Sequence, residues 1–284
     1  GSMSGILALT IVLLLLLYYS LDSIDGIIKC FEIISMIPLV GCIICIFRID
    51  LLLPIGSRIQ EVMSSWIWIL IYILIGFAYA MLHVLKQIKI KWNGNLIRKV
   101  FLAVGISSGF LILVFWMMCQ YSESFWELCG GYALLRFDDD WGSLRGTLWM
   151  QSIDAYSKGG SAQLLVGVGE DCFAPYMYGN QLLSVAMEGQ WEDAIYANAH
   201  NEFLTMLLNE GILGLVAYVG IFVTAFWRFW NMREEDPVML VGIIAIMSYC
   251  VNNFFSFQQV VSTPFLFLLI GICENRIIRR CDYS

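Results

Sequence analysis

Three groups of polar residues in this chain have the types and spacing that binding or transfer chemistry needs. The first contains Arg58, in the segment PIGSRIQEV just before an apolar stretch. An arginine at such a boundary is often an anchor whose charged head reaches water. A functional role for Arg58 is the alternative interpretation, and it depends on what else the chain contains.

The second group lies in residues 136–154, RFDDDWGSLRGTLWMQSID. Arg136 and Arg145 stand there in an acidic stretch, and a guanidinium has donors suited to bidentate recognition of phosphate. Arg145 and Trp149 are spaced to share one helical face, where the simplest interpretation is a surface cation–aromatic pair. The acids at 138–140 are interpreted as a solvated run or a helix N-cap cluster, with a divalent-metal site as the alternative.

The third group is ANAHNEFLTMLLNEGILGL, residues 197–215. His200 stands where a polar segment enters a long apolar helix, and Asn198 or Asn201 is placed to cap that helix. A histidine at such a junction is often a hydrogen-bonded structural group. The alternative is catalysis, because an imidazole exchanges protons near neutral pH.

Several other kinds of chemistry are excluded. Two histidines, His83 and His200, cannot build a His-rich metal centre. Cys42 and Cys45 are three residues apart inside an apolar run, which is poor geometry for a structural zinc site, so no metal site is predicted. Gly167 and Gly169 permit a tight turn, but they do not lie in a βαβ context, which argues against dinucleotide binding. The run GISSG at 105–109 matches G-x-S-x-G, but it lies inside an apolar stretch and not at the strand-to-helix turn of a nucleophile elbow. No cofactor is therefore expected.

The composition of the chain indicates whether its surface faces water or lipid. Of 284 residues, 60% are hydrophobic and 14% are charged, and the mean hydropathy is +0.76. A soluble domain of this length keeps a wide polar surface, so the excess apolar surface faces lipid. The net charge of −7 argues against nucleic acid as a partner. Gly1 and Ser2 precede Met3 and resemble a cloning remnant.

Apolar runs long enough to cross a bilayer predict an all-α, polytopic transmembrane helical bundle of about seven spans. The predicted organisation is 1–63 with N-terminal membrane helices and Arg58, 64–120 with two spans, 121–210 as a large outer loop, and 211–284 with three spans and a tail. The predicted spans are 5–21, 30–47, 64–85, 100–120, 211–227, 238–254 and 258–275.

Basic residues orient this bundle. The connections 86–99 and 228–237 and the C-terminal tail hold most of the lysines and arginines, which predicts that they face the cytoplasm. The segment 121–210 then lies outside, with 13 acidic and three basic residues. Its recurring aromatic and apolar residues predict folded, mostly helical structure. An N-terminus that begins outside without a signal leads us to expect further helices before this chain.

The outer loop also contains two cysteines, Cys129 and Cys172. An oxidising compartment favours disulfides, so the sequence allows a bridge between these two residues. The other cysteines mostly lie in or beside apolar runs, where cysteine behaves as a small hydrophobic residue.

Taken in order, the polar groups form a pattern over residues 50–275. It runs through Ser57-Arg58, Arg145 with Trp149, LLVGVG at 164–169 with Phe173, AHN at 199–201 and EGILGL at 210–215. This pattern resembles the O-antigen ligase and polymerase family of bacterial membrane glycosyltransferases. A large outer loop followed by three closing spans is also similar to the layout of that family.

The resemblance implies a function. Members of the family move a glycan from an undecaprenyl-diphosphate-linked oligosaccharide donor to a glycan or lipid acceptor, at the outer face of the bacterial inner membrane, without an essential metal or cofactor. It implies that Arg58 and Arg145 hold the diphosphate and that His200 assists the acceptor hydroxyl. Arg136 and Asn201 are the further candidate substrate-binding residues. Membrane lipids are the surrounding partners.

Two other classes of function remain as alternatives. A transporter or flippase for a lipid-linked glycan would place charged groups near the bilayer midplane, and few charges lie inside the predicted spans. A non-catalytic membrane protein of polysaccharide assembly would not need both Arg145 and His200. Ligase and polymerase activity, the sugar, and the linkage remain open.

Overall fold

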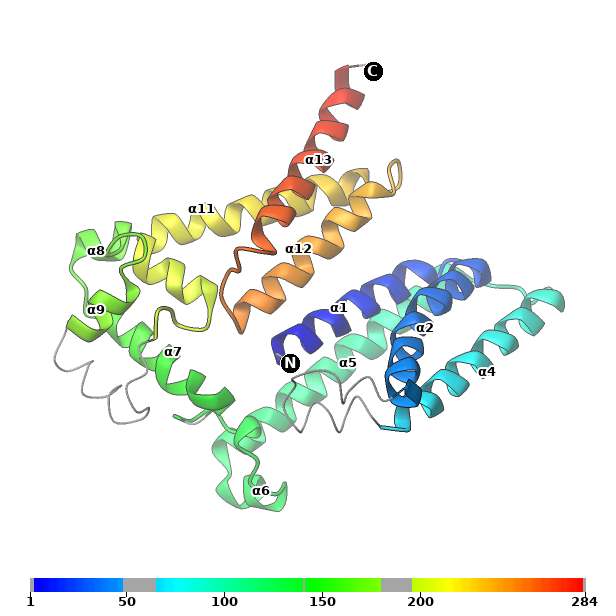
Figure 1. Ribbon diagram of the computed structural model, residues 1–284, viewed down its shortest axis with the longest axis horizontal. Coiled ribbons are helices and arrows are strands. Elements are labelled where there is room, and N and C mark those ends of the chain that lie inside the picture. The colour runs from blue at the N-terminus through cyan, green and yellow to red at the C-terminus, as the bar shows by residue number, and fades with distance from the viewer. Residues whose placement is uncertain (1–2, 48–64, 140, 180–195, 283–284) are drawn as a thin grey trace. The chain divides into compact units, whose positions relative to one another are not determined.

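The computed structural model describes residues 3–47, 65–139, 141–179 and 196–282, and these are helical with no strand among them. The predicted all-α class is thus confirmed (Figure 1). The elements are α1 (Met3–Ser20), α2 (Ile24–Phe47), α4 (Ile67–Gln87), α5 (Gly94–Tyr121), α6 (Glu123–Leu128), the 3₁₀ turn η2 (Ala133–Leu135), α7 (Trp141–Ser157), α8 (Ser161–Val166), α9 (Phe173–Gly179), α11 (Glu202–Met232), α12 (Val238–Phe254) and α13 (Thr263–Asp282).

Four of these helices, α2, α4, α5 and α11, are long and apolar enough to cross a membrane. Among the described residues, α4 has no buried residue and α5 has only Cys119. Large apolar side chains exposed along whole helices are unstable in water and stable against acyl chains. The helices therefore indicate a membrane protein, and the number of seven spans stays a prediction.

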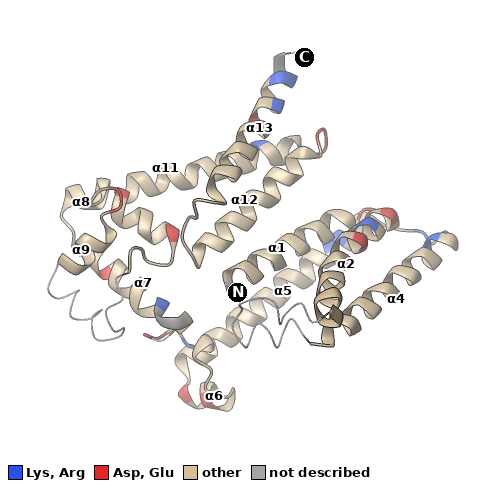
Figure 2. Ribbon diagram, viewed as in Figure 1, with Lys and Arg blue, Asp and Glu red and all other residues tan. Residues whose placement is uncertain are grey.

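The described residues fall into two compact units. One runs from Thr10 to Leu111, and the other takes Ile112 onward together with the first residues up to Leu9. In the first unit α2 packs along α4. Lys86 of α4 pairs with Asp25 of α2, with Nζ 2.5 Å from the carboxylate, and Arg98 of α5 lies 2.7 Å from Asp22, just before α2. Figure 2 shows the lysines and arginines of this unit gathered at the end where these ion pairs lie.

In the second unit, α11, α12 and α13 pack on one another around a closed apolar core. Gly242 of α12 lets the helices approach closely, because a Cβ there would lie 2.8 Å from the ring of Phe229 and 3.0 Å from Cys273 Sγ. The fully buried core side chains include Phe229, Met239, Ile243 and Cys273.

Helix α11 is interrupted at Gly211, whose φ of 66° and ψ of −171° are not helical. The interruption frees carbonyls of the preceding turn, and a buried carbonyl needs a donor. Val168 N–H donates to Leu208 O at 3.0 Å, and Gly169 N–H donates to Asn209 O at 2.8 Å. The tight turn predicted at Gly167 and Gly169 therefore exists, and it fills the break in α11.

Only glycine permits this contact. A Cβ on Gly167 would lie 2.0 Å from Asn209 O, and one on Gly211 would lie 2.4 Å from the carbonyl group of Leu165. The turn holds α8 and α9 against the first part of α11, and α7 packs there too. A second apolar core joins these elements and consists of Leu148, Trp149, Ala155, Phe173, Met177, Ala199 and Leu208.

Candidate functional site

Helix α7 presents Arg145 to the segment that follows α12. Its Nε–H donates to the carbonyl of Phe255 at 3.1 Å, and its Nη1 donates to the carbonyl of Gly142. Nη2 has no partner among the described residues. Burial lowers the pKa of Arg145, but a guanidinium keeps its charge at any physiological pH. Arg145 thus supplies a fixed, partly desolvated positive charge with donor capacity to spare.

A short polar turn places His200 at the start of α11. The backbone N–H of His200 donates to Asn198 Oδ1 at 3.0 Å. The φ of His200 is 49°, in the left-handed region, which histidine adopts more often than most residues. The half-buried ring makes edge-on contacts with Tyr196 and Phe257, with centroids 5.9 and 5.6 Å apart. Of the two candidate caps, Asn198 thus holds the turn before the helix and does not cap it.

Asn201 is the N-cap of α11. Its Oδ1 accepts from Leu204 N–H at 3.2 Å, and the residue is only 3% exposed. Thr205 closes the turn from the helix side, accepting from Ala199 N–H and donating to Asn201 O. Asn201 thus has a structural role, because it caps α11 directly after His200. A contact between Asn201 and substrate stays a prediction.

The segment after α12 joins the two halves of the site. Arg145 binds it at Phe255, and Gln258 N–H donates to the buried carboxylate of Glu202 at 2.9 Å. Phe257, between these two anchors, lies against His200. Sequence reasoning missed Glu202, because an acid just after an N-cap is common at any helix start.

Arg145 and His200 both contact the segment after α12, and the charge of Arg145 acts on the imidazole. Burial, followed by the positive charge of Arg145, lowers the pKa of His200 below its ordinary value of 6.5. Both effects favour the uncharged imidazole. The site therefore pairs a proton acceptor, neutral at physiological pH, with a permanent cation.

A pair of carboxyl groups lies where the glycine turn meets α11. Glu170 shares a hydrogen bond with Glu210, and this contact, with burial and the neighbouring negative charge, raises the pKa of Glu170. Acidic residues far apart in sequence carried no sign of this pairing. It depends on the turn at Gly167 and Gly169.

Trp149 does not form the expected surface pair with Arg145. The indole is 9% exposed and packs among aromatic rings, 5.3 Å from Trp141 and 6.0 Å from Phe255 between centroids. Helical spacing put the two residues on one face, but that face is buried against the end of α12. The interpretation as a surface cation–aromatic pair was wrong.

Arg136 makes its contacts with α6. Its guanidinium lies 5.4 Å from the Trp126 ring centroid and 3.9 Å from Glu123. Gln120 of α5 holds the backbone on both sides, donating to Leu135 O and accepting from Phe137 N–H. These contacts do not bring Arg136 to Arg145 and His200. Arg58 lies outside the described residues.

The aspartates before α7 act through their backbone. Trp141 N–H donates to Asp138 O, and Thr147 donates to Asp139 O through both its N–H and its hydroxyl. A Cβ on Gly146 would lie 1.8 Å from Asp138 O, so glycine is required where this segment crosses α7. Asp140 lies outside the described residues.

The bridge that the sequence allows between Cys129 and Cys172 is not formed, since both are free thiols. Cys129 is hydrogen-bonded with Cys119 of α5. Cys172 belongs to the glycine turn, where its N–H donates to Gly169 O. The two cysteines are thus held by different local structures.

No model of a protein family matches this chain, and no curated protein matches it.

Proposed function

We propose that this chain is a metal-independent membrane glycosyltransferase of the O-antigen ligase and polymerase type. It moves a glycan from an undecaprenyl-diphosphate-linked donor to an acceptor hydroxyl at the outer face of the bacterial inner membrane. The observation that supports this proposal is the neighbourhood of Arg145 and His200. A fixed cation beside an uncharged imidazole suits a reaction with a diphosphate leaving group and a hydroxyl nucleophile.

In the proposed step, the acceptor oxygen attacks the anomeric carbon of the donor sugar as its proton passes to an imidazole nitrogen of His200. The bond between that carbon and the diphosphate oxygen breaks, and undecaprenyl diphosphate leaves with its electron pair. Arg145 stabilises the charge through its unused donors. The N-terminus of α11, just after His200, adds a favourable field for an anion.

The proposal includes a topology. Seven helices cross the membrane, the segment 121–210 faces outside, and the C-terminus is cytoplasmic. Arg58 and Arg136 then lie at the outer side and assist the diphosphate or the glycan. This arrangement is supported by the clustering of basic residues at the ends of helices, because cytoplasmic ends collect lysine and arginine.

A transporter for the lipid-linked glycan is the second candidate. One observation favours it: the hydroxyl of Tyr79 in α4 donates to the carboxylate of Glu32 in α2 at 3.1 Å. Both helices are long and apolar enough to cross a membrane, and ionisable groups within such helices often mark transport pathways. Transport moves the donor without cleaving it.

One experiment separates these proposals. Purified protein in lipid vesicles receives an undecaprenyl-diphosphate oligosaccharide and an acceptor glycan, and the products are analysed by mass spectrometry. A transferase gives free undecaprenyl diphosphate and an extended acceptor. An intact donor that only changes leaflet indicates the transporter, and an intact donor in its original leaflet indicates a non-catalytic assembly protein.

A further inference from the structure

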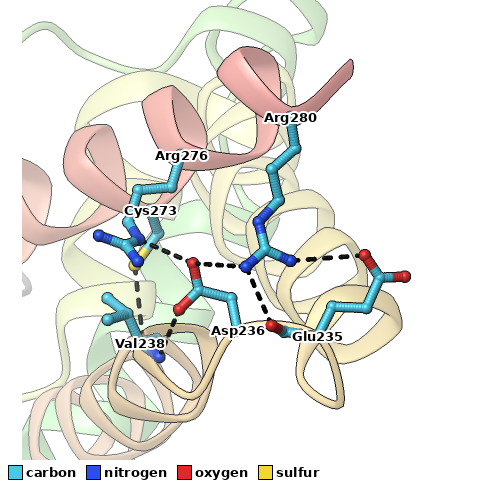
Figure 3. A network of polar contacts seen from close by, with 6 residues as sticks. All are labelled: Glu235, Asp236, Val238, Cys273, Arg276 and Arg280. Atoms are coloured by element: carbon cyan, nitrogen blue, oxygen red, sulfur yellow. Dashed lines mark hydrogen bonds and ion pairs between the residues drawn. The ribbon is translucent and has the colours of Figure 1, made fainter. Parts of the chain in front are cut away.

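A cavity of about 370 Å³ lies at the end of the second unit, far along α11 and α13 from the catalytic candidates. It is formed where the connection between α11 and α12 meets the last turns of α13 (Figure 3). The proposed transfer reaction uses none of its residues. Its lining consists of Asp236, Ile272, Asn275, Arg276, Arg279 and Arg280.

One buried carboxylate organises this cavity. Asp236 is 2% exposed, and its Oδ2 accepts from Arg276 Nε at 2.7 Å and lies 3.6 Å from Arg280. Its Oδ1 accepts from Val238 N–H at 3.0 Å, at the start of α12. The Arg276 guanidinium holds the pKa of Asp236 below its usual range, so this carboxylate stays charged. Two arginines are thereby fixed at the cavity wall.

The arginines have more donors than the protein uses. Arg276 bonds only through Nε, and Arg279 has no partner among the described residues. Arg280 also binds Glu235, at 2.9 Å through the backbone carbonyl and 3.5 Å through the carboxylate. Among the side chains that the structure describes, three guanidinium charges thus face two carboxylates, and one positive charge has no counterion.

An apolar stripe on α13 leads into these arginines. Phe265, Leu268 and Ile272 are 69%, 61% and 47% exposed. Their spacing of three and four residues continues to Arg276 and Arg279, so all five lie on one helical face. In a membrane the apolar part of this face contacts acyl chains, and the arginines lie at the level where headgroups begin.

We propose that this cavity binds the phosphate group of an anionic phospholipid, whose acyl chains lie along the Phe265–Leu268–Ile272 stripe. Arg276 and Arg279 donate to the phosphate oxygens, and Asp236 keeps Arg276 in place. A guanidinium suits this ligand because its planar donors match two phosphate oxygens at once. A free inorganic phosphate offers the same oxygens without the acyl chains, so the experiment must separate the two sources.

The test uses the delipidated full-length protein in detergent, incubated with phosphatidylglycerol or with phosphatidylcholine of the same acyl chains. Native mass spectrometry counts the bound lipids. We expect tighter binding of phosphatidylglycerol, and R279Q should weaken it about five-fold, as expected for one arginine near a membrane surface. R279Q removes no internal contact, so its thermal stability should match the parent. R276Q should weaken binding at least as much.

R228Q is the matched control, because Arg228 is bonded to Glu274 and does not line the cavity. It removes the same charge from the same end of the unit and should leave lipid binding unchanged. Equal binding by R279Q and the parent would overturn the proposal, as would an equal loss in R228Q or equal binding of phosphatidylcholine. Inorganic phosphate that displaces the lipid at millimolar concentration would assign the cavity to a free anion instead. None of these readouts requires glycan transfer.

Discussion

At the scale of single residues, His200 combines a left-handed backbone with a ring held between two aromatic side chains. Such a backbone conformation costs about 1–3 kcal/mol and persists only where its surroundings enforce it. Asn198 and the cap at Asn201 provide that enforcement. The result is an imidazole held in place between Tyr196 and Phe257.

The first prediction concerns the charge of His200. The chain has only two histidines, so an H83Q variant leaves a single imidazole to follow by NMR. We expect it to titrate below its ordinary pKa of 6.5. In an R145Q background the pKa should rise but stay below 6.5, because the larger cause, burial, remains. A midpoint at or above 6.5, or no response to R145Q, would contradict the proposed neighbourhood.

The same shift has a consequence for stability. The unfolded chain takes up a proton at the ordinary histidine pKa, before the folded protein does. The free energy of unfolding therefore falls as the pH drops below about 6.5, by at most about 1.4 kcal/mol per pH unit for this group. Comparing H83Q with H83Q/H200Q by thermal unfolding at several pH values isolates the contribution of His200.

The second prediction concerns Arg145. R145Q should weaken binding of an undecaprenyl-diphosphate donor by at least ten-fold, since a charged hydrogen bond is worth about 1.5–3 kcal/mol. R145K should recover part of the affinity, because lysine keeps the charge but not the planar donors. Arg228 supplies the control, since R228Q removes an arginine elsewhere and should bind donor normally. Full affinity in R145Q would leave this arginine with a structural role only.

At the scale of elements, the break in α11 and the glycine turn behave as one unit. The turn donates two backbone hydrogen bonds to carbonyls that the break exposes, and the close contact excludes any side chain. This contact between the turn and the break holds α8 and α9 against the first part of α11. His200 lies just before the N-cap of that helix. The position of His200 therefore depends on the backbone contact between the glycine turn and α11, in which no candidate site residue takes part.

The third prediction tests this contact. G167A and G211A each place a Cβ within 2.4 Å of backbone atoms and force a left-handed alanine, so we expect a loss of about 2–4 kcal/mol in stability. G220A is the matched control, because Gly220 lies in the same helix with nothing within 4 Å. Its stability should be unchanged or rise by up to about 1 kcal/mol. Thermal unfolding in detergent measures the stability of all three variants. Equal unfolding midpoints would contradict the claim that Gly167 and Gly211 are required for this contact.

The sequence predicted the elements well because apolar length and helix periodicity are local properties. It also predicted a turn at Gly167 and Gly169, since glycine permits the conformation. It could not predict that this turn would bind Leu208 and Asn209, because the partners of a backbone group are chosen by the tertiary fold. The sequence likewise does not show which element Arg136 contacts: it shares a stretch with Arg145, but Gln120 of α5 binds the backbone on both sides of it.

At the scale of the whole molecule, the basic residues of each unit gather at one end of its helices. In the first unit, the basic residues collect at the end where α4 meets α5 (Figure 2). In the second, Arg233, Arg276 and Arg280 lie near the α11–α12 connection and the last turns of α13. Each unit thus carries a basic end of the kind that membranes place in the cytoplasm.

The fourth prediction tests the topology. In a background with Cys129 and Cys172 changed to serine, S157C should react with a membrane-impermeant maleimide added outside intact cells. N95C should react only after the membrane is opened. Both positions are exposed, so steric access is matched. Labelling of N95C from outside would reverse the proposed orientation.

The most direct test of the account is the turnover of His200 variants in the purified transfer assay. Acid–base assistance by a positioned side chain is worth about 10²–10⁴ in rate, so H200A should lose most turnover while its thermal stability and donor binding stay near those of the parent. H200Q, which keeps a hydrogen-bonding side chain without the titration, should stay slow if His200 is the base and recover if it only positions the acceptor. A folded H200A protein that transfers glycan at the parent rate would contradict the assignment of this site.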